Sequence, residues 1–124
     1  MDIEKQMAYW RSGATEDWEA GLTLIRDGKT RHGLFFAHLA LEKALKALVI
    51  RETKEVAPRI HNLVRLAELA RLNLSDSEID ILADMNQFQM EGRYPESPPA
   101  MLKQKEAEIY IETSRELFQW LMNL

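Results

Sequence analysis

The stretch RHGLFFAHLALEKALKALVI, residues Arg31 to Ile50, decides the fold. Larger residues recur along it at three- and four-residue steps, and small residues form a second stripe with the same spacing. The larger stripe is Leu34, His38, Leu41, Leu45 and Leu48, and the small stripe is Gly33, Ala37, Ala40, Ala44 and Ala47. This period predicts an α-helix. Because the small side would let a neighbouring helix approach closely, we expect this helix to be central.

The segment before this stretch has the same period. Apolar residues recur at helical steps from Ile3 to Ile25, which predicts a first long helix. Gly28 is a plausible stop for that helix, and Thr30 is a plausible N-cap for the central one.

Two shorter helices are expected after the central one. The first covers residues 61–72, and Asn73 would close it. The second begins with Ser75 and Glu78, which have the spacing of a capping box, and extends to about Met90.

A last helix is expected to follow a proline-containing loop. Ser97 would cap it and Pro98 would take its first position, where the missing N–H is no loss. Its buried side is expected to contain Leu102, Ile109, Leu117, Trp120 and Leu121. The pattern predicts an all-α fold, an up-and-down antiparallel bundle of four to five helices, as a single domain over residues 1–124.

The composition narrows the function classes. No cysteine is present, which excludes a disulfide scaffold, a thiolate zinc site and a cysteine nucleophile. No apolar run is long enough to span a membrane and no signal-peptide pattern is present, so we expect a cytoplasmic protein without a membrane partner. Three scattered histidines do not have metal-ligand spacing, so neither a metal site nor a cofactor is expected.

The charge is unevenly distributed. The net charge of −4 argues against non-specific binding of nucleic acid. Residues 28–73, however, contain nine basic and four acidic residues, a net charge of +5, so the remainder carries −9. A basic middle with acidic ends could pack on itself, on a like subunit or around an anion, or it could simply be solvated.

Several segments in this order resemble the small prokaryotic HEPN domain family over nearly the whole chain. They are Trp18, FFAHLALEKALKALVI (35–50), PRIHNLVRLAEL (58–69) and GRYPES (92–97), with Glu42, Lys43, Lys46, His61, Leu63 and Arg93-Tyr94-Pro95 as the most telling matches. The resemblance implies a helical bundle, often a homodimer, that associates with a small nucleotidyltransferase in toxin–antitoxin modules. It also implies that many members are metal-independent ribonucleases with an Arg-x(4–6)-His pair late in the chain. Here no histidine follows His61, so Arg93 lacks that partner.

Arg31 and His38 have the Arg-x(6)-His spacing elsewhere in the chain. Seven residues are about two helical turns, so both could face one groove, with histidine as general base and arginine stabilising phosphorane charge. The alternative is a buried His38 hydrogen-bonded to Glu42, with Arg31 in solvent.

A charged strip crosses the central helix. Glu42, Lys43 and Lys46 could contact an anion or a partner, or Glu42 and Lys46 could form an ordinary i,i+4 ion pair. His61, at the start of the next helix, could bind a ligand or fix the turn.

The loop QMEGRYPESPPA, residues 89–100, is expected to fix the backbone around Arg93 and Tyr94, because Pro95 and Pro98 restrict its conformations. Arg93 could therefore bind a phosphate or a partner carboxylate, or tie the loop down by bridging to Glu42 or another carboxylate on a helix.

We hypothesise a nucleotide-binding or partner-binding subunit with a groove lined by Arg31, His38, Glu42, Lys46, Arg93 and Tyr94. One alternative is a metal-independent ribonuclease toxin with a non-standard Arg/His site. The other is a purely structural interaction subunit.

Overall fold

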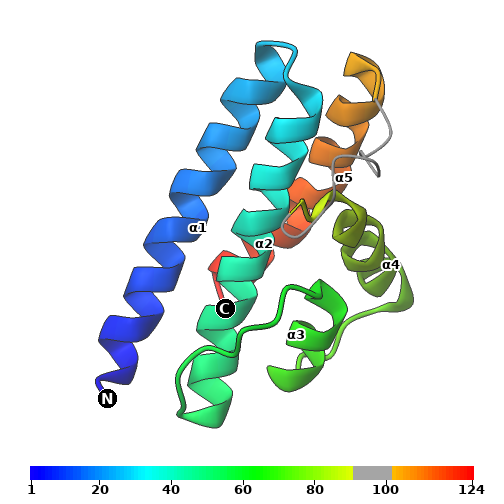
Figure 1. The fold of residues 1–124 in the computed structure, drawn as a ribbon. Helices are drawn as coiled ribbons and strands as arrows, with labels where there is room; N and C mark the ends of the chain where they lie inside the picture. Colours follow the sequence, from blue (N-terminus) through cyan, green and yellow to red (C-terminus); the bar gives the residue numbers. More distant parts are fainter. Residues whose placement is uncertain (91–101) are drawn as a thin grey trace.

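The computed structural model describes residues 1–90 and 102–124. Within these residues, five α-helices and one 3-10 turn follow one another. They are α1 (Ile3–Arg26), α2 (Thr30–Thr53), α3 (Leu63–Leu69), α4 (Asp76–Met85), the 3-10 turn η1 (Asn86–Phe88) and α5 (Gln104–Met122). α1 and α2 form an antiparallel pair, α3 and α4 lie on the side of α2 away from α1, and α5 passes behind α2 and contacts α1 as well (Figure 1). The predicted all-α bundle is confirmed.

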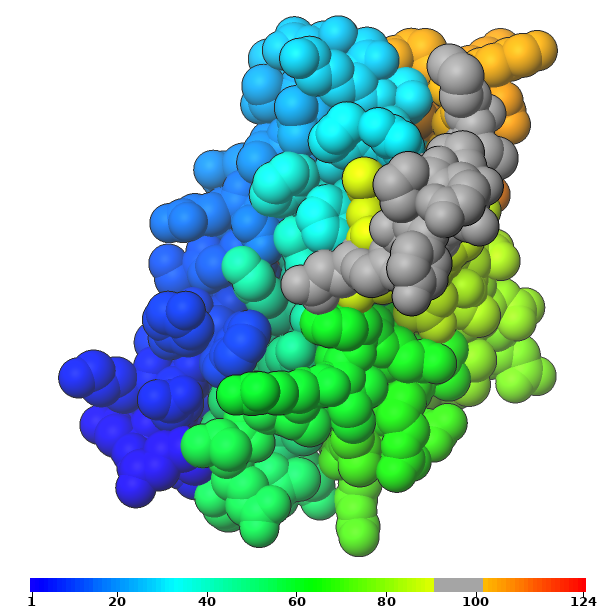
Figure 2. Space-filling view, viewed as in Figure 1, coloured from blue at the N-terminus to red at the C-terminus, as the bar shows by residue number. Residues whose placement is uncertain are grey.

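The central position of α2 is confirmed as well. Most of its residues are buried, including every member of both predicted stripes. α1, α3 and α5 all pack against it. On the face shown in Figure 2, the middle of α2 is visible in narrow patches between α1 and α3. Trp18 of α1 stacks on Phe118 of α5 at 4.6 Å between ring centroids, which joins the outer helices in one core.

Two glycines set the distance between α1 and α2. A Cβ placed on Gly21 would lie 2.9 Å from the carbonyl oxygen of Gly33, and one on Gly33 would lie 2.6 Å from the Ile25 side chain. Real Cβ atoms do not come that close to other heavy atoms. The backbones of the two helices are therefore in near contact, as the small stripe predicted.

Several predicted helix ends are confirmed and others are wrong. The capping box of Ser75 and Glu78 is present at the start of α4. The predicted cap at Thr30 is wrong, because Thr30 is already helical and its hydroxyl donates to the Leu102 carbonyl at 3.2 Å. α3 is shorter than predicted and begins after Asn62, whose side chain accepts from the Arg65 N–H.

The later helix ends also differ from the prediction. α3 ends at Leu69, with Arg71 in a left-handed conformation (φ 55°), rather than at Asn73. α4 ends at Met85 and η1 continues it to Phe88, short of the predicted Met90. α5 begins at Gln104. The start predicted at Ser97 and Pro98 lies outside the described residues.

The predicted buried side of α5 is partly wrong. Leu117 and Leu121 are buried and Leu102 is half-buried, but Ile109 is 58% exposed and Trp120 is 41% exposed. The buried side instead contains Ala107, Ile111, Ser114, Leu117, Phe118 and Leu121. α5 is thus oriented with Ile111 and Phe118 toward the core and with Ile109 and Trp120 toward solvent.

Candidate functional site

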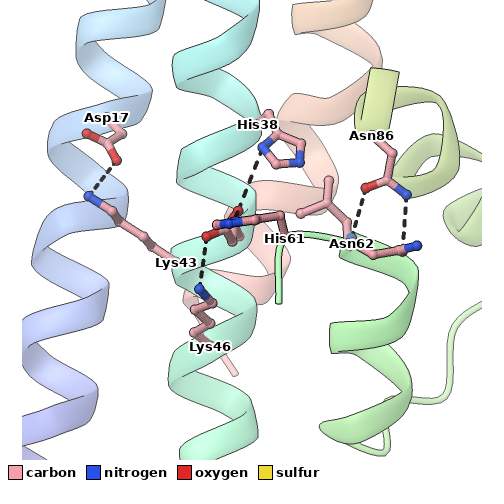
Figure 3. Close-up of polar contacts among 9 residues, drawn as sticks. Asp17, His38, Lys43, Lys46, His61, Asn62 and Asn86 are labelled. Atoms are coloured by element: carbon pink, nitrogen blue, oxygen red, sulfur yellow. Dashed lines mark hydrogen bonds and ion pairs between the residues drawn. The ribbon is translucent and has the colours of Figure 1, made fainter. Parts of the chain in front are cut away.

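A buried carboxylate organises the polar part of the bundle. Glu42, in the middle of α2, is only 4% exposed. One of its oxygens accepts from the Lys46 ammonium at 3.0 Å, and the other lies 3.1 Å from Nδ1 of His61, in the segment before α3 (Figure 3). A buried ion is tolerated only when its partners replace its lost water. Glu42 is therefore held by an ammonium and an imidazole, and it ties α2 to the segment before α3.

His38 lies one turn before Glu42 on α2 and is fully buried. Its Nδ1 is 3.9 Å from Glu42 Oε1, too long for a hydrogen bond, and neither ring nitrogen has a well-formed hydrogen-bond partner. Burial lowers the pKa of His38, while the Glu42 carboxylate and, more weakly, the His61 backbone act in the opposite direction. The predicted burial of His38 is confirmed, but the predicted hydrogen bond to Glu42 is not formed.

Lys46 is 5% exposed, and its ammonium lies 5.3 Å from the centroid of the Trp10 ring on α1. An ammonium at this distance from an indole face gains from the ring quadrupole. The Lys46 ammonium thus contacts both Glu42 and Trp10. The contact with Trp10 joins α1 to the same cluster.

Lys43 points in a different direction from Lys46. Its ammonium pairs with Asp17 of α1 at 2.8 Å (Figure 3), and its stem lies against Gly13. Beside it lies a surface hollow of about 320 Å³, lined by Tyr9, Trp10, Ser12, Gly13, Glu16 and Lys43. Tyr9 is 70% exposed at this hollow and meets Trp10 edge to face. We call these six residues the α1–α2 pocket.

The sequence did not predict the α1–α2 pocket. Trp10 continues the apolar stripe of α1, which by itself predicts a core or interface residue, and Tyr9 has no motif around it. The relevant signal is the i,i+4 spacing of Gly13 and Asp17, which leaves room on α1 for a long side chain from a neighbouring helix. That signal has meaning only once the partner helix is known.

Arg31 is not brought together with the buried cluster. It lies in the first turn of α2 with its side chain exposed, and it makes no hydrogen bond or ion pair with other described residues. His38, by contrast, is inaccessible to solvent. The structure therefore gathers His38, Glu42, Lys46 and His61, places Lys43 at the α1–α2 pocket, and leaves Arg31 apart.

Two of the predicted site residues cannot be placed. Arg93 and Tyr94 lie outside the described residues, and so does their predicted convergence on Glu42.

Neither a metal cluster nor a membrane helix is found in residues 1–90 and 102–124. No group of three or more histidine, aspartate or glutamate side chains is placed there to hold a metal ion. None of the helices in these ranges combines the length and the apolar character that crossing a bilayer requires.

Comparisons with known proteins agree with the fold. The profile of the HEPN domain matches residues 7–124. The crystal structure of TT1696 from Thermus thermophilus is similar in fold, with a TM-score of 0.77 at 19% sequence identity, and the match covers 95% of this chain and 97% of that one. No curated protein matches significantly in sequence. Since the profile covers essentially the whole chain, this protein belongs to the HEPN domain family.

Proposed function

We propose that this HEPN protein is a non-catalytic binding subunit that takes a nucleotide in the α1–α2 pocket. We further propose that it acts as a cytoplasmic homodimer beside a small nucleotidyltransferase, as in a toxin–antitoxin module. The partner class is proposed because the resemblance to small prokaryotic HEPN proteins implies association with a small nucleotidyltransferase. The α1–α2 pocket supplies the place for the ligand.

The burial of His38 is the observation that most disfavours catalysis by the predicted pair. A general base must come within hydrogen-bond reach of the proton it removes. The His38 ring is completely buried, and Arg31 stands in solvent at the start of the same helix. The pair therefore cannot meet one substrate without opening the core.

The α1–α2 pocket has the size and chemistry for a small aromatic ligand. Its volume of about 320 Å³ is at the lower end of ligand sites, which span roughly 300–1,000 Å³. The exposed ring of Tyr9 offers a stacking surface for a base, an interaction of about 1–3 kcal/mol. The Lys43 ammonium can then bind an anionic group.

The carboxylates around Lys43 restrict the ligand further. Glu16 lines the pocket and Asp17 already pairs with Lys43. Each added phosphate would increase repulsion from these two carboxylates. A nucleoside or nucleoside monophosphate therefore fits better than a triphosphate.

Calorimetric titration tests this proposal. AMP, GMP, ATP and adenosine are each titrated into the purified protein. We expect saturable heat with a monophosphate and weaker binding of ATP. Lys43→Met should weaken monophosphate binding at least tenfold, because it removes the cation but keeps the stem against Gly13.

Lys105→Met, an exposed lysine on α5, is the matched control and should bind as the parent does. Absence of heat with every nucleotide, or an equal loss in both variants, would rule out the α1–α2 pocket as a nucleotide site.

A second candidate function is a purely structural interaction subunit. The filled coordination of Glu42 by Lys46 and His61 favours it, because a cluster of this kind can serve the fold alone. The neighbouring reading frame distinguishes the two. If it encodes a small nucleotidyltransferase, co-expression should yield a stable complex under the leading proposal.

The ribonuclease alternative has a test of its own. A ribonuclease toxin would slow growth on expression, and His38→Ala would relieve that effect.

A further inference from the structure

A second hollow lies between α4 and α5, away from the Glu42 cluster. Its volume is about 260 Å³, and its walls are Ile81, Asp84, Met85, Ile109, Tyr110 and Thr113. α4 packs beside α5 here (Figure 1). The hollow is smaller than the roughly 300–1,000 Å³ typical of small-molecule sites, and most of its walls are apolar. It therefore suits one large apolar side chain of a protein partner, of the kind that anchors interfaces.

Two exposed apolar residues of α5 lie on the side of the hollow, and we call them the Ile109–Trp120 stripe. Ile109 is 58% exposed and Trp120 is 41% exposed. They are eleven residues apart, so they lie on the same side of the helix, with Thr113 and Glu116 between them. The stripe is about 17 Å long at 1.5 Å per residue, or three helical turns. Its length matches that of a short helix lying alongside.

The surroundings of the hollow and stripe are acidic. α4 and α5 together contain eight acidic and two basic residues, a net charge of −6. Asp84 lines the hollow and Asp80 lies one turn before it, while Glu106 and Glu116 follow the stripe on α5. Of the two basic residues of α5, Arg115 is taken up by an ion pair with Glu112 at 3.1 Å, and Lys105 is exposed one turn before Ile109, so the acidic residues outnumber a single nearby cation. An apolar seam with acidic borders has its complement in an apolar seam with basic borders.

We propose that the α4–α5 face, defined by the hollow and the Ile109–Trp120 stripe, docks a basic amphipathic helix of a partner protein. An apolar side chain of that helix fills the hollow, and its lysines or arginines pair with Asp80, Asp84 and Glu116. A second copy of this chain using the same face would bring like charges together, and RNA carries the wrong sign. The inference rests on the proposed function only in assigning the chain an associative role.

Chemical-shift mapping tests the α4–α5 face. The probe is an 18-residue amidated peptide of leucine and lysine in amphipathic helical order, titrated into ¹⁵N-labelled protein. We expect saturable shifts centred on the backbone amides of α4 and of residues 105–120. The same pattern built from leucine and glutamate should cause none, and a lysine peptide with serine for leucine should bind at least tenfold more weakly.

Two variants carry the same charge change at different places. Ile109→Asp should weaken binding of the leucine–lysine peptide at least tenfold. Val56→Asp should leave it unchanged, because Val56 is 71% exposed in the segment between α2 and α3. Shifts centred elsewhere, equal loss in both variants or no binding would overturn the proposal.

The two proposals can fail separately. Heat on titration of a nucleoside monophosphate should be the same in Ile109→Asp and in the parent. Loss of nucleotide binding in the parent would therefore leave the α4–α5 face untouched, and the reverse also holds. If Ile109→Asp instead abolishes self-association of the parent, the face belongs to a second copy and the partner-helix proposal is wrong.

Discussion

Glu42 has the role of a hub for three parts of the chain. Through Lys46 it reaches Trp10 on α1, and through His61 it reaches the segment before α3. The sequence predicted the i,i+4 spacing of Glu42 and Lys46, and the pair forms. The contribution of this ion pair to the free energy of unfolding differs from that of a surface pair, because both side chains are almost completely buried. Removing one partner then leaves an uncompensated charge in the interior.

Glu42→Gln should therefore destabilise the protein by about 3 kcal/mol, since the Lys46 ammonium keeps its buried position and loses its counter-charge. Urea unfolding followed by circular dichroism measures the change. Glu68→Gln is the control: its pair with Arg65 is more than half exposed and is worth less than about 1 kcal/mol. Similar losses in the two variants would show that Glu42 is an ordinary surface-type partner.

His38 gives stability a pH dependence whose sign follows from its burial. Desolvation lowers the pKa of His38 below the ordinary value of 6.5, against the opposing effects of Glu42 and the His61 backbone. Below about pH 6.5 the unfolded chain gains a proton at this histidine before the folded chain does. The contribution of His38 to the free energy of unfolding is complete above that pH and decreases as the pH falls.

His38→Leu should flatten this dependence. It removes both the titrating group and two ring nitrogens that lack partners, so the variant should be more stable than the parent by about 1 kcal/mol at pH 5.5. Unfolding curves between pH 5 and 8 measure the difference between the two proteins. If the free energy of unfolding changes with pH in the same way in His38→Leu and in the parent, a group other than His38 is responsible for the dependence.

Contacts between distant residues are the part of the site that the sequence could not give. Helical period predicted the partners at i and i+4, but His61 meets Glu42 across nineteen positions, and Lys43 meets Asp17 on another helix. Both contacts depend on how the segment after α2 folds back and on how closely α1 approaches. Neither is encoded in a local pattern.

At the scale of helices, the small stripe of α2 predicted a close neighbour, and α1 is that neighbour. Gly21 and Gly33 bring the two backbones together. Gly13, also on α1, has a different surrounding: a Cβ there would meet only the flexible Lys43 stem, at 3.1 Å. Gly21 and Gly13 are thus both inside α1, but Gly21 packs against rigid backbone and Gly13 packs against a flexible side chain.

Gly21→Ala should destabilise the protein by about 1–3 kcal/mol, because the added methyl meets rigid backbone and forces the helices apart. Gly13→Ala should stay within about 1 kcal/mol of the parent, because the lysine can move and alanine favours the helix by about 0.5–1 kcal/mol. Thermal and urea unfolding of the pair provide the comparison. Equal effects would mean that helix propensity alone governs both positions.

Helix interiors were more predictable than helix ends and faces. The capping box at Ser75 and Glu78 has a local chemical signature, and it forms as predicted. The start of α2 has no such local signature. The Thr30 hydroxyl donates to the carbonyl of Leu102, which lies far away in the sequence. The exposed positions of Ile109 and Trp120 contradict the predicted buried side of α5, because the side that holds Ile111 and Phe118 faces the core instead.

Over the whole molecule, charge is separated between the helices. α4 and α5 carry a net charge of −6, while the chain as a whole carries −4. Like surfaces of this sign repel, most strongly at low ionic strength. A symmetric dimer should therefore use another face.

We accordingly expect the homodimer proposed above to persist in Ile109→Asp and at low salt. Light scattering on the size-exclusion peak gives the mass directly. A dimeric parent with a monomeric variant would place the α4–α5 face in the dimer instead.

The near contact of Gly21 with Gly33 has a mechanical consequence. Because their backbones are in near contact, α1 and α2 cannot shift along each other by one helical turn. The side chains beside the contact would clash with those of the neighbouring helix. A force applied to one of these two helices must therefore move both as one rigid unit.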